Sequence, residues 1–448
     1  MERIFGTDGI RGRAGEGWLA LPAVAALGRV LGRVMEEETR GGPRSVLLAH
    51  DGRRSGPSIE AALAHGLTQS GFSPRSVGLC TTPGLAWLTR DEEFAFGAMV
   101  SASHNAAADN GIKVFARGGE KLSDAVELEI ERALREEQQE GVQPRAVEHD
   151  PALEVAYMNH LLEAGAGDLV LDGVVIAVDC ANGGGSRVGP RVFGRLGAQV
   201  HALAAEPDGE NINRDCGSTS PEALQREVRS RRARLGVALD GDGDRCILVD
   251  EKGSVVNGDG ILTVLARQAK ASGRLADPRV VATVMSNRGL HRALREVGVG
   301  VLEVGVGDRQ VVESMRSEAL ALGGEQSGHI VLGDENAYIG DGLFTALRVL
   351  RAMREAGGPL SALVAPYRPY PQVLLNVPVT HKPSLVELPR VRELVQRIET
   401  ELGQDGRVLV RYSGTEPLAR VMVEGPELSG IQARAHELAS AIEREIGS

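Results

Sequence analysis

The sequence contains little cysteine, and the cysteines it has lie far apart. Only four occur in 448 residues, with no CxxC pair and no spacing typical of a metal site: Cys80, Cys180, Cys216 and Cys246. This pattern argues against a disulfide framework and against a zinc site. It favours reduced thiols in a reducing compartment.

Long apolar stretches are also absent. No run approaches the roughly 18 apolar residues of a membrane-spanning helix, and the opening residues MERIFGTDGIRG lack the apolar core of a signal peptide. We therefore expect a cytoplasmic protein that does not associate with a membrane.

Positive charge is in deficit. The chain has 50 Lys and Arg against 61 Asp and Glu, so its formal net charge is −11. This balance argues against a general nucleic-acid-binding protein. An anionic ligand would need a locally basic pocket within an acidic protein.

Three stretches of the chain share one layout, and 448 residues are too many for a single core. The strand-like runs SVLLAH, GVVIAVD and RVVATVM each lead into a loop of small residues and then an amphipathic helix. Each helix is followed by a glycine (Gly71, Gly197 and Gly298) and by another strand-like run. This βαβ pattern predicts three related α/β domains.

Regular structure breaks at PYRPYPQ, residues 366–372, because its three prolines cannot continue a helix or a central strand. The remainder alternates strand-like runs with helical patterns near 386–402 and from Leu428. We expect a smaller α+β domain there, and we place the four domains at residues 1–150, 151–251, 252–365 and 366–448.

The most specific motif is a cluster of carboxylates in LGVALDGDGDRCILVD. Asp240, Asp242 and Asp244 alternate with glycines directly after the strand-like run 235–239. Three carboxylates in one loop repel each other unless a hard divalent cation lies among them. A calcium EF-hand does not fit, because Arg245 occupies the position that needs glycine and strands flank the loop. A magnesium site at a strand end fits better than a solvated acidic turn.

Two serines flank an alanine in SASHN, residues 101–105, after the apolar run 94–100. Serine and asparagine favour turns because their side chains bind nearby backbone groups. A serine beside a histidine is equally a candidate nucleophile or phosphate carrier. The motif alone leaves both interpretations open.

A basic, hydroxyl-rich turn occurs in RYSGTEPLARVM. It offers charge, hydroxyl groups and a backbone amide to a dianionic phosphate through Arg411, Ser413, Gly414, Thr415 and Arg420. An ordinary hairpin with two surface arginines is an equally good interpretation of this turn alone.

Two further polar loops carry weaker signals. In GGEQSGH, we expect Glu325 and Ser327 on an extended segment, where a spacing of two residues puts both side chains on one side to bind vicinal hydroxyls. In FGTDGIRG, Arg11 lies between glycines. Either loop could equally be solvated surface.

Taken together and in order, these motifs resemble the α-D-phosphohexomutase superfamily and, within it, most closely the phosphoglucosamine mutase family. The matching stretches run through the whole chain: FGTDGIRG, SASHN with DNGIK, PDGENIN with CGST, DGDGDR, MSN, VGDR, GEQSGH and RYSGTEP with RVM. The resemblance implies three related α/β domains and a smaller fourth around a central cleft, with closure of the fourth domain about residues 366–372.

The resemblance also implies the reacting residues. Ser103 corresponds to the family's phosphoserine, and one Mg²⁺ per chain would be held by phosphorylated Ser103 together with Asp240, Asp242 and Asp244. Arg245 corresponds to an arginine near the phosphoryl group. Proton transfer or charge stabilisation at the reacting oxygen is implied for Lys113, His329 and Arg11.

The remaining implied roles concern the substrate. Glu325 and Ser327 would bind sugar hydroxyls, and the turn from Arg411 to Arg420 would hold the phosphate that is not reacting. The implied reaction interconverts glucosamine 6-phosphate and glucosamine 1-phosphate through a hexosamine 1,6-bisphosphate, in amino-sugar nucleotide synthesis. The partner is thus a small phosphosugar, and a homodimer is compatible with the resemblance.

Two alternatives stay open at this point. A phosphomannomutase/phosphoglucomutase would more often carry methionine where Gln326 stands. A non-catalytic sugar-phosphate-binding protein would have no use for a metal-linked nucleophile. The chain also departs from the family pattern at Ala106, at Val304 and at Tyr338–Ile339, which concerns loop rigidity and substrate preference more than phosphoryl chemistry.

Overall fold

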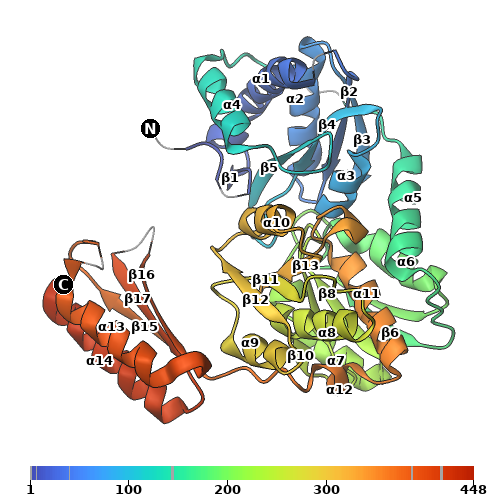
Figure 1. The fold of residues 1–448 in the computed structure, drawn as a ribbon. Coiled ribbons are helices and arrows are strands. Elements are labelled where there is room, and N and C mark those ends of the chain that lie inside the picture. The colour runs from blue at the N-terminus through green and yellow to red at the C-terminus, as the bar shows by residue number, and fades with distance from the viewer. Residues whose placement is uncertain are drawn as a thin grey trace. The chain divides into compact units, whose positions relative to one another are not determined.

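The computed structural model describes residues 3–6, 8–39, 41–142, 146–384, 387–413 and 417–447. The chain divides into two compact units (Figure 1). The first unit comprises Met1–Val284 and Leu302–Val364, and the second comprises Met285–Val301 and Ala365–Ser448.

The first sheet of the first unit has the strand order β1-β5-β4-β2-β3. Its strands are β1 (Ile10–Arg13), β2 (Ser45–His50), β3 (Ser73–Leu79), β4 (Phe94–Val100) and β5 (Asp109–Ala116). Strand β2 runs parallel to β3 and β4, whereas β5 is antiparallel to both β4 and β1. The helices of this region are α1 (Leu21–Thr39), α2 (Gly56–Gln69), α3 (Thr82–Leu88) and α4 (Asp124–Glu136).

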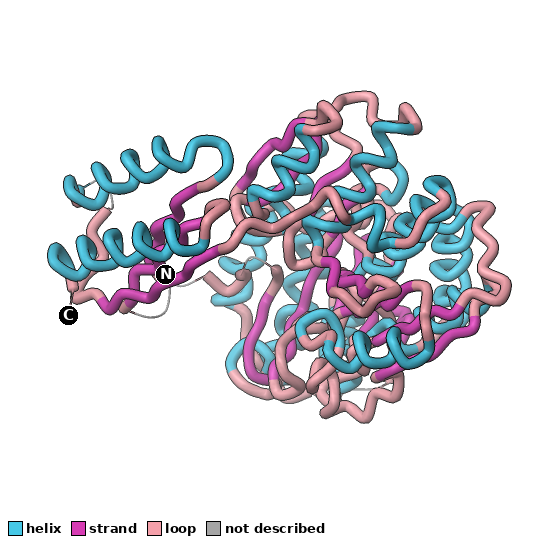
Figure 2. Tube along the Cα trace, turned by 90° about the horizontal axis from the view of Figure 1, so that it is seen from below, coloured by secondary structure: helices cyan, strands magenta, loops and turns pink. Residues whose placement is uncertain are grey.

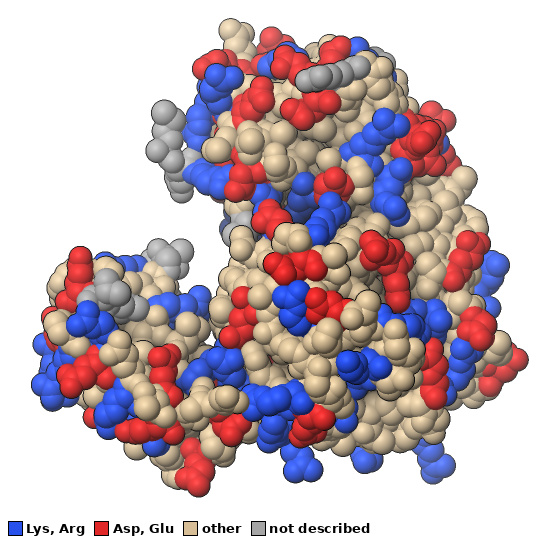
Figure 3. Space-filling model, in the orientation of Figure 1, with Lys and Arg blue, Asp and Glu red and all other residues tan. Residues whose placement is uncertain are grey.

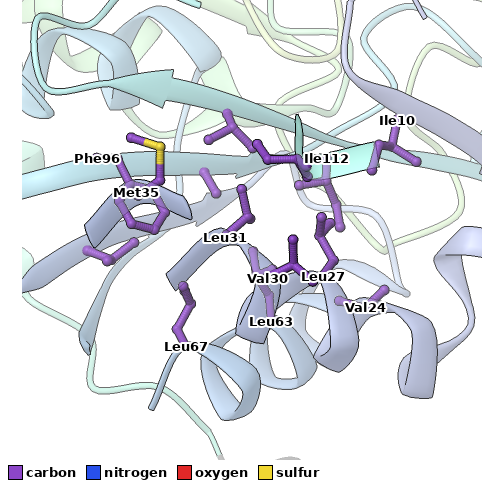
Figure 4. Close-up of a cluster of buried hydrophobic side chains, with 14 of the residues drawn as sticks. Ile10, Val24, Leu27, Val30, Leu31, Met35, Leu63, Leu67, Phe96 and Ile112 are labelled. Carbon is purple, nitrogen blue, oxygen red and sulfur yellow. The ribbon is translucent and has the colours of Figure 1, made fainter. Parts of the chain in front are cut away.

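Helices α1 and α2 form the core of this region together with the sheet. Figure 4 shows Leu27 and Leu31 of α1 and Leu63 of α2 with Phe96 and Ile112 of the sheet, and all five side chains are buried. The apolar face of each helix follows the 3.6-residue period expected from the sequence. This packed layer fixes the strand from which the SASHN loop emerges.

The second sheet has the order β10-β9-β8-β6-β7. Its strands are β6 (Val175–Asp179), β7 (Gln199–Leu203), β8 (Leu235–Leu239), β9 (Cys246–Val249) and β10 (Val255–Val256), with helices α5 (Pro151–His160), α6 (Val188–Arg195) and α7 (Glu222–Arg231). The parallel core of the sheet is β7-β6-β8, and β9 turns back antiparallel to β8.

The third sheet has the order β12-β11-β13-β14. Its strands are β11 (Arg279–Thr283), β12 (Gly300–Val304), β13 (Leu322–Gly324) and β14 (Ile330–Leu332), and the helices that accompany it are α8 (Gly258–Ala271), α10 (Asp308–Ser317), α11 (Gly342–Ala356) and α12 (Leu360–Val364). The glycines expected to follow the helices do so with positive φ angles: Gly71 at 81°, Gly197 at 93° and Gly298 at 70°.

The second unit contains a smaller antiparallel sheet of order β15-β17-β16. The unit also contains α9 (Arg288–Arg295), and its other elements are β15 (Gln372–Pro378), α13 (Pro389–Leu402), β16 (Arg407–Tyr412), β17 (Leu418–Glu424) and α14 (Leu428–Ile446). Figure 2 shows the two helices running side by side, and buried residues from both helices and all three strands form one apolar cluster. The predicted fold class, three α/β domains followed by a smaller α+β domain, is confirmed.

The charge distribution of the surface and the length of the apolar helices can be compared with what the composition predicts. Basic and acidic side chains are interspersed on the face shown in Figure 3. Among the described residues, no helix is long and apolar enough to cross a membrane.

Candidate active site

The three aspartates lie together in the hairpin loop between β8 and β9. One carboxylate oxygen from each of Asp240, Asp242 and Asp244 lies within 4.8 Å of the others, and all three residues are buried. Asp242 Oδ1 and Asp244 Oδ1 are buried without a hydrogen-bond partner among the described residues. Buried carboxylate oxygens without donors are what a divalent cation binds, so the donor set fits Mg²⁺.

The charges within this loop affect one another strongly. Burial raises the pKa of Asp240 well above its usual range, and the charges of Asp244 and Asp242 raise it further. Burial alone would raise the pKa of Asp244 too, but the Lys113 ammonium and His329 hold it well below its usual range. A cation among these carboxylates would offset the repulsion.

Ser103 lies directly beside this cluster. It follows β4, is 1% exposed, and its Oγ donates a hydrogen bond to Asp240 Oδ2 at 2.6 Å. Its φ angle of 52° is in the left-handed region, which a serine rarely adopts and which recurs at functional sites. The second serine of SASHN thus joins a cluster that is 137 residues away in the sequence.

Ser101 has a different position. Its Oγ donates to Asp51 Oδ2 at 2.6 Å and accepts the Ser103 N–H at 2.9 Å. Both contacts of Ser101 Oγ are made within the loop and with Asp51. Ser101 therefore supports the conformation of Ser103 and makes no contact with the three aspartates in the described hydrogen bonds.

Arg53 and Asn213 also hold the SASHN loop, and sequence reasoning missed both. The Arg53 guanidinium donates to the backbone carbonyls of Ser103, Asn105, Ala106 and Asp109. The Asn213 amide donates to the first two of these carbonyls at 2.9 and 3.0 Å. The only sequence signals were their positions in DGRRSG, the loop after β2, and in the matching stretch PDGENIN.

Lys113 and His329 bring positive charge to the cluster. Lys113 Nζ donates to Asp242 Oδ2 at 2.8 Å and lies 3.5 Å from Asp244 Oδ2. His329 Nδ1 lies 3.9 Å from Asp244 Oδ1.

Both groups are cationic at neutral pH. Burial alone would lower the pKa of Lys113, but the charges of Asp242 and Asp8 raise it well above its usual value. Burial likewise would lower the pKa of His329, but the interaction with the nearby Asp244 carboxylate raises it to about 9. Two buried cations therefore offset part of the negative charge of the three aspartates.

Arg245 and Arg11 lie at the edge of the same region. The backbone N–H of Arg245 donates to Asp240 Oδ1 at 3.2 Å, and its guanidinium lies 3.2 Å from His104 Nδ1. His104 Nδ1 in turn lies 3.4 Å from Ser103 Oγ. Arg11 extends from β1 and pairs with Asp8.

The loop with Glu325 and Ser327 is a turn between β13 and β14, so the prediction of an extended segment is wrong. The Gly328 N–H closes the turn on Glu325 O at 3.0 Å. Gly328 has a φ angle of 96°, and a Cβ there would lie 2.3 Å from Cys246 O, so glycine permits the reversal. The two polar side chains still share a side, because Ser327 Oγ lies 3.4 Å from Glu325 Oε2.

Arg411 and Arg420 lie in the second unit, in the hairpin of β16 and β17. They are directly opposite each other in the antiparallel register, so they share one face of the sheet. Ser413 is buried at the end of β16, and its N–H donates to Leu418 O at 2.8 Å. Gly414 and Thr415 lie outside the described residues.

Four family models cover most of the chain. All four describe phosphoglucomutase/phosphomannomutase: alpha/beta/alpha domain I matches residues 2–141, domain II 155–253, domain III 257–370 and the C-terminal domain 374–441.

Curated relatives match over the whole length. A phosphoglucosamine mutase of Solibacter usitatus is 45% identical over 446 residues, which is 99% of each chain. One of Moorella thermoacetica is 46% identical and covers 99% of this chain and 100% of its own.

Solved structures share the fold. A phosphoglucomutase/phosphomannomutase family protein of Burkholderia thailandensis has a TM-score of 0.80 at 25% identity, over 99% of each chain. An N-acetylphosphoglucosamine mutase of Aspergillus fumigatus, solved with GlcNAc-6P and magnesium, has a TM-score of 0.68 at 18% identity, over 98% of this chain and 95% of that one, and shows the fold alone.

These findings confirm the family predicted from the motifs, and they do not favour the phosphomannomutase/phosphoglucomutase alternative. The chain belongs to the phosphoglucosamine mutase family of the α-D-phosphohexomutase superfamily and is an isomerase.

Proposed function

We propose that this chain interconverts glucosamine 6-phosphate and glucosamine 1-phosphate by passing a phosphoryl group through Ser103. The observation that carries the proposal is the contact of Ser103 Oγ with Asp240, inside a cluster of three buried carboxylates. A nucleophile linked to a cation site is what reversible phosphoryl transfer needs, whereas binding alone has no use for it.

The transfer takes two steps. A sugar hydroxyl attacks the phosphorus of phosphorylated Ser103 and the bond from phosphorus to Oγ breaks. The sugar oxygen loses one proton, and the departing Ser103 Oγ takes up one, so the step is balanced. The product is a glucosamine 1,6-bisphosphate. After the sugar reorients, Ser103 Oγ attacks the phosphorus of the other phosphate and the bond from that phosphorus to the sugar oxygen breaks. The serine loses its proton, the sugar oxygen takes up one, and the isomer is released.

The cation site belongs to the same mechanism. Asp240, Asp242, Asp244 and phosphorylated Ser103 would hold one Mg²⁺, which neutralises charge on a transferring phosphoryl group when it is bound. The two unpartnered carboxylate oxygens described above support this assignment.

The buried cations would serve the proton and the developing charge. Lys113 and His329 carry protons near neutral pH and lie within 4 Å of the carboxylates, so either can donate a proton to an oxygen that leaves phosphorus. Arg245, through its place beside His104, and Arg11 would stabilise negative charge on the phosphoryl oxygens.

Two sets of residues would bind the substrate. Glu325 and Ser327 would bind sugar hydroxyls, and the carboxylate of Glu325 would favour the protonated amine of glucosamine. Gln326 does not contribute to that preference in our proposal, because its amide donates to Asp259 at 3.2 Å. Arg411, Ser413 and Arg420, with Gly414 and Thr415, would hold the phosphate that is not reacting.

Three broader assignments stay proposals. We divide the chain into domains at 1–150, 151–251, 252–365 and 366–448, and we place the protein in the cytoplasm, where four free and buried cysteines would remain reduced. We keep a homodimer as a prediction that analytical ultracentrifugation tests.

The test of this proposal combines detection of a covalent phosphate on Ser103 with measurements of mutase activity. Mass spectrometry of the purified protein should find a phosphate on the peptide that contains Ser103, and Ser103→Ala should lack both the phosphate and mutase activity. Rates on the 1-phosphates of glucosamine, glucose and mannose should fall in that order, and exhaustive treatment with EDTA should remove activity that Mg²⁺ restores. A fully active Ser103→Ala variant would end the phosphoserine mechanism, and mannose 1-phosphate as the best substrate would refute the substrate assignment.

A further inference from the structure

A row of four alternating charges connects the start of α10 to Lys113. The Asp308 carboxylate contacts Lys121 Nζ, which lies 2.6 Å from Asp8 Oδ1. Asp8 Oδ2 in turn lies 2.8 Å from Lys113 Nζ. We call Asp308, Lys121, Asp8 and Lys113 the charge row.

The charge row lies largely out of solvent. Lys113 is 2% exposed, and the other three side chains are mostly buried. Ion pairs at such depth are weakly screened by salt, and removing one partner leaves the other charge without compensation. Each member of the charge row therefore depends on its neighbours.

Packing does not confine the two lysines on every side. A cavity of about 240 Å³ is bordered by Lys113, Lys121 and Asp308, and its other walls include Phe115 and Tyr338. The lysine ammonium is carried on a flexible four-carbon side chain, so open space beside it permits other rotamers. The ion pairs, rather than steric contact, keep Lys113 directed at the aspartates.

The same segment also supports the sugar loop. The backbone N–H of Gly307, the residue before Asp308, donates to Glu325 Oε1 at 3.2 Å. One short segment at the start of α10 thus contacts both the loop proposed to read the sugar and the charge row that ends at the proton-transfer lysine.

We propose that Lys121 and Asp308 are positioning residues for Lys113. Asp308 and Lys121 hold the Asp8 carboxylate, and Asp8 holds Lys113 Nζ beside Asp242 Oδ2. Lys121 holds Asp8 Oδ1, whereas Arg11 and Lys113 both contact Oδ2. Without Lys121 the Asp8 carboxylate is held at one oxygen only, and Lys113 can rotate into the cavity and away from the reacting oxygen. This inference rests on the proposed function of Lys113.

A merely structural role is the competing explanation, because Lys121 and Asp308 lie 187 residues apart and also tie two segments of the first unit together. Arg309 provides a matched control. It makes the same kind of connection, donating to Glu127 at 2.6 Å and to Leu122 O at 3.1 Å, but it contacts neither Asp8 nor Lys113 in the described contacts.

The test compares Lys121→Met with Arg309→Met in steady-state mutase kinetics and thermal unfolding. We expect Lys121→Met to lower kcat about tenfold to a hundredfold, the usual effect of a misplaced catalytic group, with little change in KM. Arg309→Met should lower the unfolding temperature by a similar amount and leave kcat near that of the unmodified protein. Asp308→Asn should lower kcat less than Lys121→Met, because Lys121 keeps its contact with Asp8. This second variant also tests the proposal if Lys121→Met does not fold.

A double variant separates this inference from the proposed function. In a Lys113→Ala background, Lys121→Met should cause no further loss of kcat, because the group that it positions is gone. Full activity of Lys113→Ala alone would refute the role proposed for Lys113. An inactive Lys113→Ala combined with an unchanged kcat for Lys121→Met, or an equal loss of kcat in Arg309→Met, would overturn the positioning role and leave the proposed function standing.

Discussion

The stability and activity of the protein should depend on Arg53, whose guanidinium donates hydrogen bonds to the backbone carbonyls of the SASHN loop. Arg53 and Asp51 are both buried, with an Arg53 Nε to Asp51 Oδ2 distance of 2.9 Å. The other four N–H groups of the guanidinium donate to loop carbonyls, so all five donors of the side chain are used. No other side chain offers five donors in this planar arrangement.

The magnitudes follow from these contacts. Arg53→Met would leave the Asp51 charge buried and unpaired, which costs about 3–5 kcal/mol of the free energy of unfolding. Arg53→Lys would keep a cation but has three donors for five acceptors, which leaves two acceptors unsatisfied; at about 1–3 kcal/mol for each, we expect a loss of about 2–6 kcal/mol. In both variants Ser103 should lose its fixed left-handed conformation, so kcat should fall at least about tenfold.

Urea unfolding followed by circular dichroism, together with mutase kinetics, measures both effects. The matched control is Arg54→Met in the next position of the chain, because the Arg54 side chain is 72% exposed and pairs only with the exposed Glu210 among its described contacts. Surface pairs of this kind contribute at most about 1 kcal/mol, so this variant should behave like the unmodified protein. An Arg53→Lys variant with unchanged stability and kcat would refute the reasoning, since it would mean that the loop carbonyls do not need these donors.

Three further predictions concern other parts of the molecule. Ser101→Ala should stay active but lose about 1–3 kcal/mol of unfolding free energy, because it removes a hydrogen bond to a buried carboxylate; loss of activity equal to that of Ser103→Ala would contradict it. Arg420→Ala should raise KM for the sugar phosphate more than it lowers kcat, and a change in kcat alone would move Arg420 to the reacting centre. Burial and the charge of His149 lower the pKa of His50 from 6.5 to about 4, so the folded protein stays neutral at His50 while the unfolded chain takes up a proton. The free energy of unfolding should therefore fall by up to about 3 kcal/mol as the pH drops from 6.5 to 4, and this part of the loss should be absent in His50→Gln.

Features that depend on a short stretch of sequence were predicted well. Strands β4 and β8 occupy residues 94–100 and 235–239 as expected, because apolar runs bounded by turn residues define them locally. The two loops that follow these strands carry Ser103 and the aspartates. A strand end fixes where such a loop begins, so the candidate residues could be found without tertiary information.

Features that depend on contacts between distant segments were not predicted. Arg53 lies 50 residues from Ser103, and nothing in DGRRSG distinguishes it from its neighbour Arg54, although one is buried and the other exposed. The turn at Glu325 was missed for a related reason. The close approach of Gly328 to Cys246 O belongs to a contact with β9, which the spacing of Glu325 and Ser327 does not reveal.

The same division explains how this site can be both reactive and ordered. Ser103 has a strained φ angle and Lys113 is a flexible cation beside open space, so neither would keep a useful geometry through its own segment alone. Arg53 fixes the conformation of the loop that carries Ser103, and the charge row fixes the position of Lys113. In both cases the charged groups come from another segment of the chain. Buried ion pairs lose much of their Coulomb gain to desolvation, so their contribution here is better explained by positioning than by stability. The phosphoserine that we propose at Ser103 would need such positioning, because a loosely held phosphoryl group would be open to hydrolysis before a sugar binds.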